Sequence, residues 1–150
     1  MDANIERATI EYYLKRADAY IGSPMLSAFY GARAARTGDR ERSLRLLDEG
    51  YGAFVSDRFM NTHEYRPDRF PEQPVAGPFY ANMGGFLMSL VYGLPGLRLS
   101  DADPSTWPER PVILPTGWDA IEIDRLWARG KPMHLRARHG DDRANLAPLS

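Results

Sequence analysis

The segment from Phe79 to Gly96 constrains the fold most strongly, because it is the most apolar stretch of the 150-residue chain. It reads FYANMGGFLMSLVYGLPG. From Phe79 to Tyr92 the apolar residues leave almost no polar stripe, which predicts a central helix buried on all sides. Gly93 stands where a helix C-cap glycine is expected, and Pro95 prevents continuation of the helix. A helix of about 14 residues spans roughly 21 Å, too short to cross a bilayer.

Two adjacent glycines, Gly84 and Gly85, lie inside this predicted helix. Each one costs roughly 1 kcal/mol relative to alanine in a helix interior. We therefore expect the pair to permit close approach of a neighbouring backbone or of a bound ligand. The pair lacks the third glycine, the lysine and the preceding strand of a phosphate-binding loop.

Composition indicates a one-domain chain that is not a nucleic-acid-binding or membrane protein. The chain is 43% hydrophobic, which suffices for a core, and its formal charge is -1. It has no cysteine, and its three histidines show no metal-ligand spacing, so we expect neither a metal nor a cofactor. The N-terminal residues lack the apolar core of a signal peptide, which gives a cytoplasmic location by default, although a signal could lie upstream if the chain is a fragment.

Three helices are predicted before residue 56. The first runs from residue 4 to about 20, with apolar positions at Ile5, Ala8, Tyr12, Tyr13 and Tyr20. Ser23 and Pro24 begin the second helix, which Gly38 ends. Asp39 caps the third helix, and the short link between them predicts an antiparallel hairpin. The expected buried face of the third helix comprises Leu44, Leu47, Tyr51, Phe54 and Val55.

The rest of the chain divides into a loop, the central helix and a β-region. Residues 57–78 carry four prolines and little periodicity, which predicts a long loop with a function. We expect domain boundaries at 1–98 for the helices, 99–110 for a linker, 111–140 for a small β-module and 141–150 for a polar tail. Apolar alternation at 120–127 and 133–138, separated by a turn at 129–132, predicts antiparallel strands. The fold class is thus mainly α with a C-terminal β-module.

The segment FYANMGGFLMSLVYGLPGL resembles the end of the helical barrel in glycoside hydrolase family 65, which includes acid trehalases, related glucosidases and disaccharide phosphorylases. The resemblance extends to SPMLSAFYGARAARTGDRERSLRLL before it and to RPVILPTGWDAIEIDRLWARGKPMHLRAR after it. It implies the last helices of an (α/α) six-hairpin toroid barrel followed by a small antiparallel sheet. It covers only the C-terminal part of a family member.

Glu64 is the predicted catalytic residue. Inverting glycoside hydrolysis needs a carboxylate that activates water, about 6.5 to 9.5 Å from the general acid. Glu64 lies in the predicted loop, and its surroundings resemble the "E-aromatic-R" stretch of the hydrolytic family members. An exposed loop glutamate is most often a solvated surface charge, and Glu72 is a second candidate for the same role.

Seven further residues are predicted to bind the sugar or support Glu64. His63 would orient Glu64 or bind a hydroxyl group, although an exposed histidine without such a role is the more common case. The aromatic ring of Tyr65 would stack on a sugar. Arg66 would hold the glutamate ionised through a charge-assisted contact. The remaining positions are Phe79, Asn82, Gly84 and Gly85. Trp107, Trp118 and Trp127 could offer a further stacking surface, although covering the helices is the more common use of such residues.

Two departures from the family pattern favour hydrolysis over phosphorolysis. The phosphorylases that this segment resembles carry a histidine and a serine before the glycine pair. Those two side chains bind the phosphate. Phe79 and Asn82 stand in those places, and Phe79 cannot donate a hydrogen bond to an anion. The resemblance therefore implies an inverting hydrolase acting on an α-linked glucose disaccharide such as trehalose. A phosphorylase of the same family and a non-catalytic helical assembly module are the alternatives.

The general acid of the family lies in a motif that this sequence does not contain, and four helices cannot close a barrel of six hairpins. We therefore expect a fragment, a split gene product or a subunit whose partner carries the remaining helices, or a homo-oligomer. An apolar patch left uncovered on residues 79–92 would mark that interface.

Overall fold

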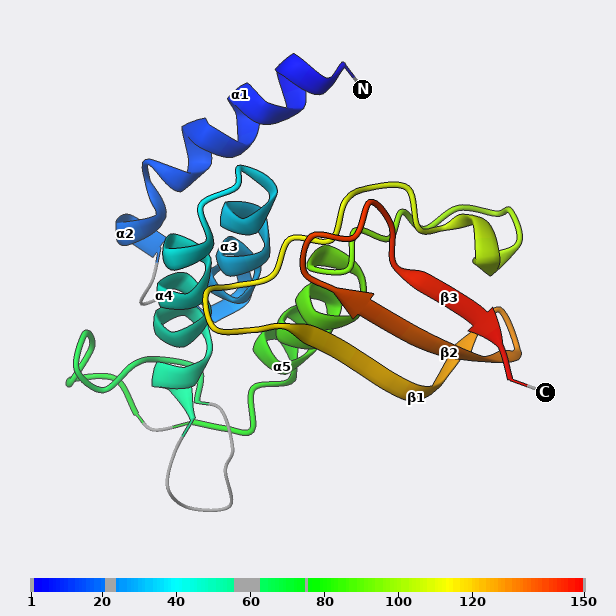
Figure 1. Cartoon of the computed structure of the whole chain (residues 1–150). Helices are drawn as coiled ribbons and strands as arrows, with labels where there is room; N and C mark the ends of the chain where they lie inside the picture. The colour runs from blue at the N-terminus through cyan, green and yellow to red at the C-terminus, as the bar shows by residue number, and fades with distance from the viewer. Residues whose placement is uncertain (1, 21–23, 56–62, 75, 150) are drawn as a thin grey trace.

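The computed structural model describes residues 2–20, 24–55, 63–74 and 76–149 of the chain (Figure 1). Helices make up the first part and a three-stranded antiparallel sheet the last, which confirms the predicted fold class. The helices are α1 Ala3–Leu14, α2 Ala17–Tyr20, α3 Pro24–Arg36, α4 Arg40–Gly50 and α5 Tyr80–Met88. Short helical turns are η1 Gly52–Phe54, η2 Ser89–Gly93 and η3 Pro104–Thr106, and the strands are β1 Ala120–Ala128, β2 Lys131–Arg138 and β3 Asn145–Pro148.

Helices α3 and α4 form the predicted antiparallel hairpin. The Asp39 side chain accepts a hydrogen bond from the Arg42 backbone nitrogen at 3.0 Å, which confirms the predicted cap. Gly38 has a φ of +87°, the left-handed conformation expected of the glycine that ends a helix. The predicted cap at Ser23 lies outside the described residues.

Small residues bring the two helices of the hairpin close together. The Ser43 hydroxyl donates to the Gly31 carbonyl at 2.8 Å, and the Ser27 hydroxyl donates to the Gly50 carbonyl at 3.0 Å. A Cβ atom added at Gly50 would overlap the Ser27 carbonyl oxygen. Close contact of the two backbones therefore depends on glycine and serine.

The buried faces of α1 and α4 differ in part from the predicted ones. Leu47 and Phe54 are buried, as predicted. In α4 the buried residues are Ser43, Leu46, Leu47 and Gly50, whereas Leu44 is 40% exposed. In the N-terminal region the predicted apolar face is exposed at Ile5, Ala8, Tyr12 and Tyr13, and the buried residues are Leu14 and Ala17. The predicted first helix is also divided, since α1 ends at Leu14 and α2 begins at Ala17.

The apolar segment forms α5, which continues into a π-helical turn, η2. The Leu94 backbone nitrogen donates to the Ser89 carbonyl at 2.9 Å, five residues back. The positive φ that ends the segment belongs to Gly96 and not to Gly93, since Gly96 has a φ of +75°. Burial on all sides is wrong for the chain as described, because Tyr80 is 74% exposed and Leu87 is 57% exposed.

The sheet packs on the helices through one shared core. Met133, Leu135 and Ala137 of β2 belong to the same buried cluster as Ala32 and Ala35 of α3. Strand β1 bulges between Ile123 and Leu126, where two residues of β1 lie opposite one residue of β2. The bulge keeps Ile121, Ile123, Leu126 and Ala128 on the inward face, as their burial shows.

Two segments that were predicted to lie outside the folded elements contribute to the core. Within 141–150, the predicted tail, β3 pairs with β2 and Leu146 is buried. Within 99–110, the predicted linker, the Trp107 side chain is buried in the shared core. Among the described residues, no helix is long and apolar enough to span a membrane.

Candidate functional site

The backbone around Glu64 is fastened on both sides. The His63 backbone nitrogen donates to the Phe54 carbonyl at 2.8 Å, which joins the loop to η1. The Glu64 backbone nitrogen donates to the Ala76 carbonyl at 2.8 Å, which brings the two ends of the loop together. Glu64 is partly exposed, so its carboxylate lies on a fixed backbone with access to solvent.

Arg66 forms a different ion pair from the predicted one. Its guanidinium donates to both carboxylate oxygens of Asp68, at 2.9 and 2.6 Å, and to the Glu49 carbonyl at 3.1 Å. The hydrogen bond from Arg66 is the main cause that lowers the pKa of Asp68. The expectation that Arg66 pairs with Glu64 is therefore replaced by a structural contact to the end of α4.

Two consecutive backbone carbonyl groups at the end of α4 accept hydrogen bonds from predicted site residues. The last carbonyls of a helix lack partners within it, and side-chain donors can supply them. The Glu49 carbonyl accepts from Arg66, and the Gly50 carbonyl accepts from the Asn82 amide nitrogen at 3.2 Å. The loop and α5 are thereby attached to one helix end, where a cation is also favoured by the helix dipole.

The predicted residues of α5 divide into a buried set and an exposed set. Asn82 is fully buried, and Gly85 is buried against Ala28 and Phe29, each 3.2 Å from where its Cβ atom would lie. Gly84 is exposed, and no described atom lies within 4 Å of where its Cβ atom would be. Close helix packing therefore accounts for Gly85 and leaves Gly84 without a packing reason in the described chain.

Aromatic side chains surround the loop and the start of α5. The ring of Tyr65 meets the ring of Phe70 edge to face, with centroids 5.7 Å apart. Tyr51 stacks in parallel on Phe86, with centroids 3.8 Å apart. Sequence reasoning missed the Tyr51–Phe86 stack, because the two residues are far apart in the chain and belong to different helical segments. Phe79, which precedes the first turn of α5, is partly exposed.

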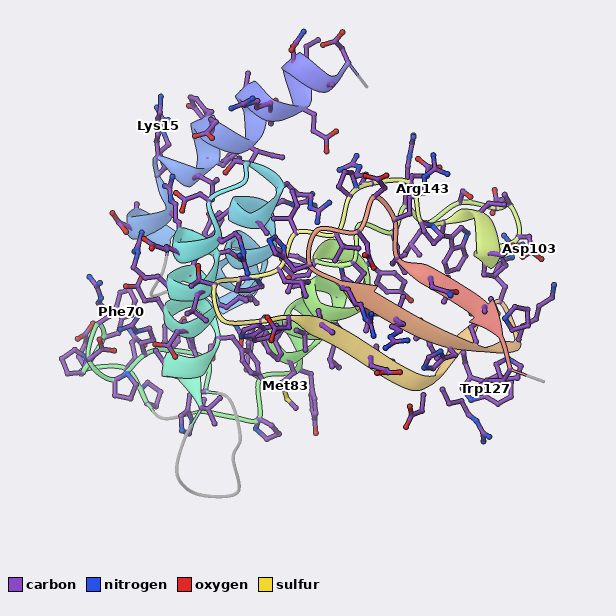
Figure 2. All side chains as sticks on the ribbon, in the orientation of Figure 1. Lys15, Phe70, Met83, Asp103, Trp127 and Arg143 are labelled. Carbon is purple, nitrogen blue, oxygen red and sulfur yellow. The ribbon has the colours of Figure 1, made fainter. Side chains whose placement is uncertain are left out.

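Glu72 is an exposed residue of the same loop as Glu64. Figure 2 shows the labelled side chain of Phe70 far from the labelled side chain of Met83 in α5. Glu72 is exposed, two residues beyond Phe70, whereas Glu64 lies where the loop meets Ala76. The backbone of Glu64 is therefore joined to the segment that leads into α5.

Three hollows of the described surface lie away from Glu64. One, of about 610 Å³, lies between α1 and α3, and two others hold about 280 and 340 Å³. Glu64 lines none of these three. The three tryptophans do not form one stacking surface, since Trp107 is buried and Trp127 is 64% exposed. Within the described ranges, no group of three histidine, aspartate or glutamate side chains is arranged to hold a metal ion.

The comparison with known proteins finds a distant relative. Over 125 residues the chain is 28% identical to an alpha,alpha-trehalose phosphorylase of Geobacillus stearothermophilus. The match covers 81% of this chain and 14% of that enzyme, at its C-terminal end. No family model matches the chain, and no solved structure matches it. The likeness suggests a carbohydrate-active enzyme family and leaves hydrolysis and phosphorolysis undistinguished.

Proposed function

We propose that this chain is the C-terminal part of an inverting glycoside hydrolase that acts on an α-linked glucose disaccharide such as trehalose. Glu64 would be the general base that activates water. The general acid and the remaining helices of the barrel would come from further polypeptide, either another chain or a preceding part of a longer one. The distant similarity to a disaccharide phosphorylase supports the class of substrate.

The observation that carries the role of Glu64 is the fastening of its backbone. General-base catalysis needs a carboxylate held in a defined place and open to the reacting water. Backbone hydrogen bonds from His63 to Phe54 and from Glu64 to Ala76 support the first requirement, because they fix the main chain that carries the carboxylate. The partial exposure of Glu64 meets the second. Tyr65, His63 and the start of α5 would then form part of the sugar pocket.

Two residues before the glycine pair, Phe79 and Asn82, favour hydrolysis over phosphorolysis. Asn82 is fully buried, and its amide nitrogen donates to the Gly50 carbonyl, so that donor does not face an incoming anion. Phe79 has no side-chain donor. Water therefore fits this end of α5 better than phosphate does.

Two other functions have one observation each in their favour. Phosphorolysis is favoured by the name of the relative, which is a phosphorylase. A non-catalytic assembly role is favoured by the exposed apolar side chains of α5. Phosphorolysis and the assembly role each predict a different result from hydrolysis in the experiment below.

The test measures products from trehalose with the complete enzyme, obtained by producing this chain together with the polypeptide encoded before it. Hydrolysis yields two glucose molecules without phosphate, whereas phosphorolysis yields one glucose and one glucose 1-phosphate and stops when phosphate is removed. Glu64→Gln should lower kcat by more than about 10²-fold, because the amide cannot accept the proton.

The matched control is Glu72→Gln in the same loop, which should retain the wild-type rate within about threefold. Loss with Glu72→Gln and none with Glu64→Gln would assign the base to Glu72. Unchanged rates in both variants would support the assembly role. The chain alone should show no turnover, and measurable glucose release from it would contradict the need for further polypeptide.

A further inference from the structure

A second hollow lies apart from the Glu64 loop. It has a volume of about 280 Å³ and is bounded by α3, the end of α5, η2 and the segment around Gly96 to Leu99. None of the residues predicted to bind the sugar lines it. Phe29, Met88 and Tyr92 supply apolar and aromatic walls. The volume is at the lower end of the range for small-ligand sites, which is about 300 to 1,000 Å³.

The charged residues of this hollow are strongly unbalanced. Four arginines line it, Arg33, Arg36, Arg98 and Arg110, against one acidic residue, Glu6. The whole chain has a formal charge of -1, so the positive charge is local and does not reflect composition. Walls of low polarity strengthen the field of such a cluster, which attracts anions.

The one carboxylate in this hollow, that of Glu6, already has a partner. Glu6 binds Arg110 with both oxygens, at 2.7 and 3.0 Å, and so attaches α1 to the segment before the sheet. Arg98 pairs with Glu109 at 3.4 Å on the exposed rim. Among the described residues, neither Arg33 nor Arg36 forms a salt bridge with a carboxylate. The negative charge of Glu6 acts on Arg36 from a distance, but its two oxygens are bound to Arg110.

Arg36 retains donors that its structural contacts do not use. Two of its nitrogens donate to the Pro111 and Leu94 carbonyls, each at 2.8 Å. Its Nε atom is buried and has no partner among the described residues. Burial, followed by the charges of Arg110 and Arg33, lowers the pKa of Arg36 to about 10. Neighbouring positive charge thus acts on a guanidinium that is already desolvated.

A structural explanation covers part of this cluster. Cations at the last turn of a helix are stabilised by the dipole, and Arg33 and Arg36 lie in the last turn of α3. That effect explains neither the unpartnered Nε atom of Arg36 nor the convergence of Arg98 and Arg110 from outside the helix.

We propose that this hollow binds an oxyanion group, a phosphate or a carboxylate, of a small ligand, with Arg33 and Arg36 as its main donors. The planar fork of a guanidinium matches both groups, and each arginine offers up to five N–H donors. Arg33 is exposed and carries no described structural contact, so it would close over the ligand, while Arg36 is held in place by its two carbonyls. The site is independent of the proposed glycoside chemistry.

The experiment titrates inorganic phosphate, and separately acetate, into the full chain at constant ionic strength set with sodium chloride, with calorimetry as the measurement. We expect saturable binding of one or both anions. Arg33→Gln should weaken that binding at least about fivefold, because it removes a charge-assisted donor. The preferred anion distinguishes a phosphate ligand from a carboxylate ligand.

Arg136→Gln is the matched control, since Arg136 is an exposed arginine of β2 outside this hollow. Its affinity should stay within about twofold of the wild type. Arg98→Gln is a second test at the rim and should weaken binding less than Arg33→Gln does. No saturable binding of either anion, or equal affinities in Arg33→Gln and Arg136→Gln with native circular dichroism, would overturn the proposal.

Discussion

Arginine side chains join distant segments of this chain by donating to backbone carbonyls. Arg36 reaches Leu94 and Pro111, and Arg40 reaches Leu114 and Pro115. The two arginines lie on either side of the α3–α4 turn and hold the segment that leads into the sheet. Planar guanidinium groups suit this use, because their several donors point in fixed directions.

The pairing of Asp103 with Lys131 gives a residue-scale prediction about pH. The Lys131 ammonium donates to Asp103 at 2.9 Å, and Ser105 donates to it as well. These contacts, with Lys131 the largest cause, lower the pKa of Asp103 from 3.8 to about 2. A carboxyl whose folded-state pKa is depressed adds stability above its unfolded pKa. That contribution should therefore be present above about pH 4 and be lost as the pH falls to about 2.

Urea unfolding between pH 2 and 5 measures this contribution. In Asp103→Asn the free energy of unfolding should fall less steeply over this range than in the wild type. Asp124→Asn, at an exposed aspartate of β1, should keep the wild-type slope. Equal slopes for all three proteins would show that the Lys131 contact adds no stability.

At the scale of elements, two glycines in helices should respond in opposite ways to alanine. Gly84 in α5 has open space around its missing Cβ atom, so Gly84→Ala should stabilise the chain by about 0.5–1 kcal/mol. At Gly50 the added Cβ atom would overlap the Ser27 carbonyl, so Gly50→Ala should destabilise it by about 1–3 kcal/mol. Thermal and urea unfolding of the two variants measure both values.

In the complete enzyme Gly84→Ala separates two explanations of that glycine. A stabilised variant with reduced trehalose turnover would indicate that ligand or further polypeptide approaches Gly84 closely. Unchanged turnover would mean that the glycine has no such role.

The sequence predicted which elements exist better than which faces they bury. The Asp39 cap and the turn at Gly38 depend on local chemistry, so they could be read from neighbouring residues. The buried face of α4 could be predicted only in part: Leu47 was found, whereas Ser43 and Gly50 were missed because they face α3 for their small size. A search for apolar periodicity ignores such residues and selects exposed ones such as Leu44.

The same limit applies to the candidate site. Sequence located the loop and Glu64 within it, since prolines and the lack of periodicity mark a loop. It could not show that Arg66 binds Asp68 and the end of α4, because that choice depends on where the guanidinium lies in space. Nor could it show that β3 completes the sheet, since four residues give too short a pattern.

At the scale of the whole molecule, the exposed face of α5 is one of the apolar surfaces that the described chain leaves uncovered. Tyr80, Gly84, Leu87 and Met88 recur at helical spacing, and all four are exposed. Figure 1 shows α5 between the hairpin and the sheet. A row of large apolar side chains there is typical of an interface.

We expect this face to mediate association, either with a second copy of the chain or with the polypeptide that carries the remaining helices. Leu87→Gln should weaken association, because it places an amide at the centre of the row, while changing the free energy of unfolding by less than about 0.5 kcal/mol at so exposed a site. Leu99→Gln, at a leucine that is 48% exposed outside α5, is the matched control. Sedimentation velocity over a range of concentrations measures the effect. A wild-type chain that sediments as a monomer at high concentration rules out the homo-oligomer. If Leu87→Gln also fails to weaken assembly with the co-produced polypeptide, the face is not an interface.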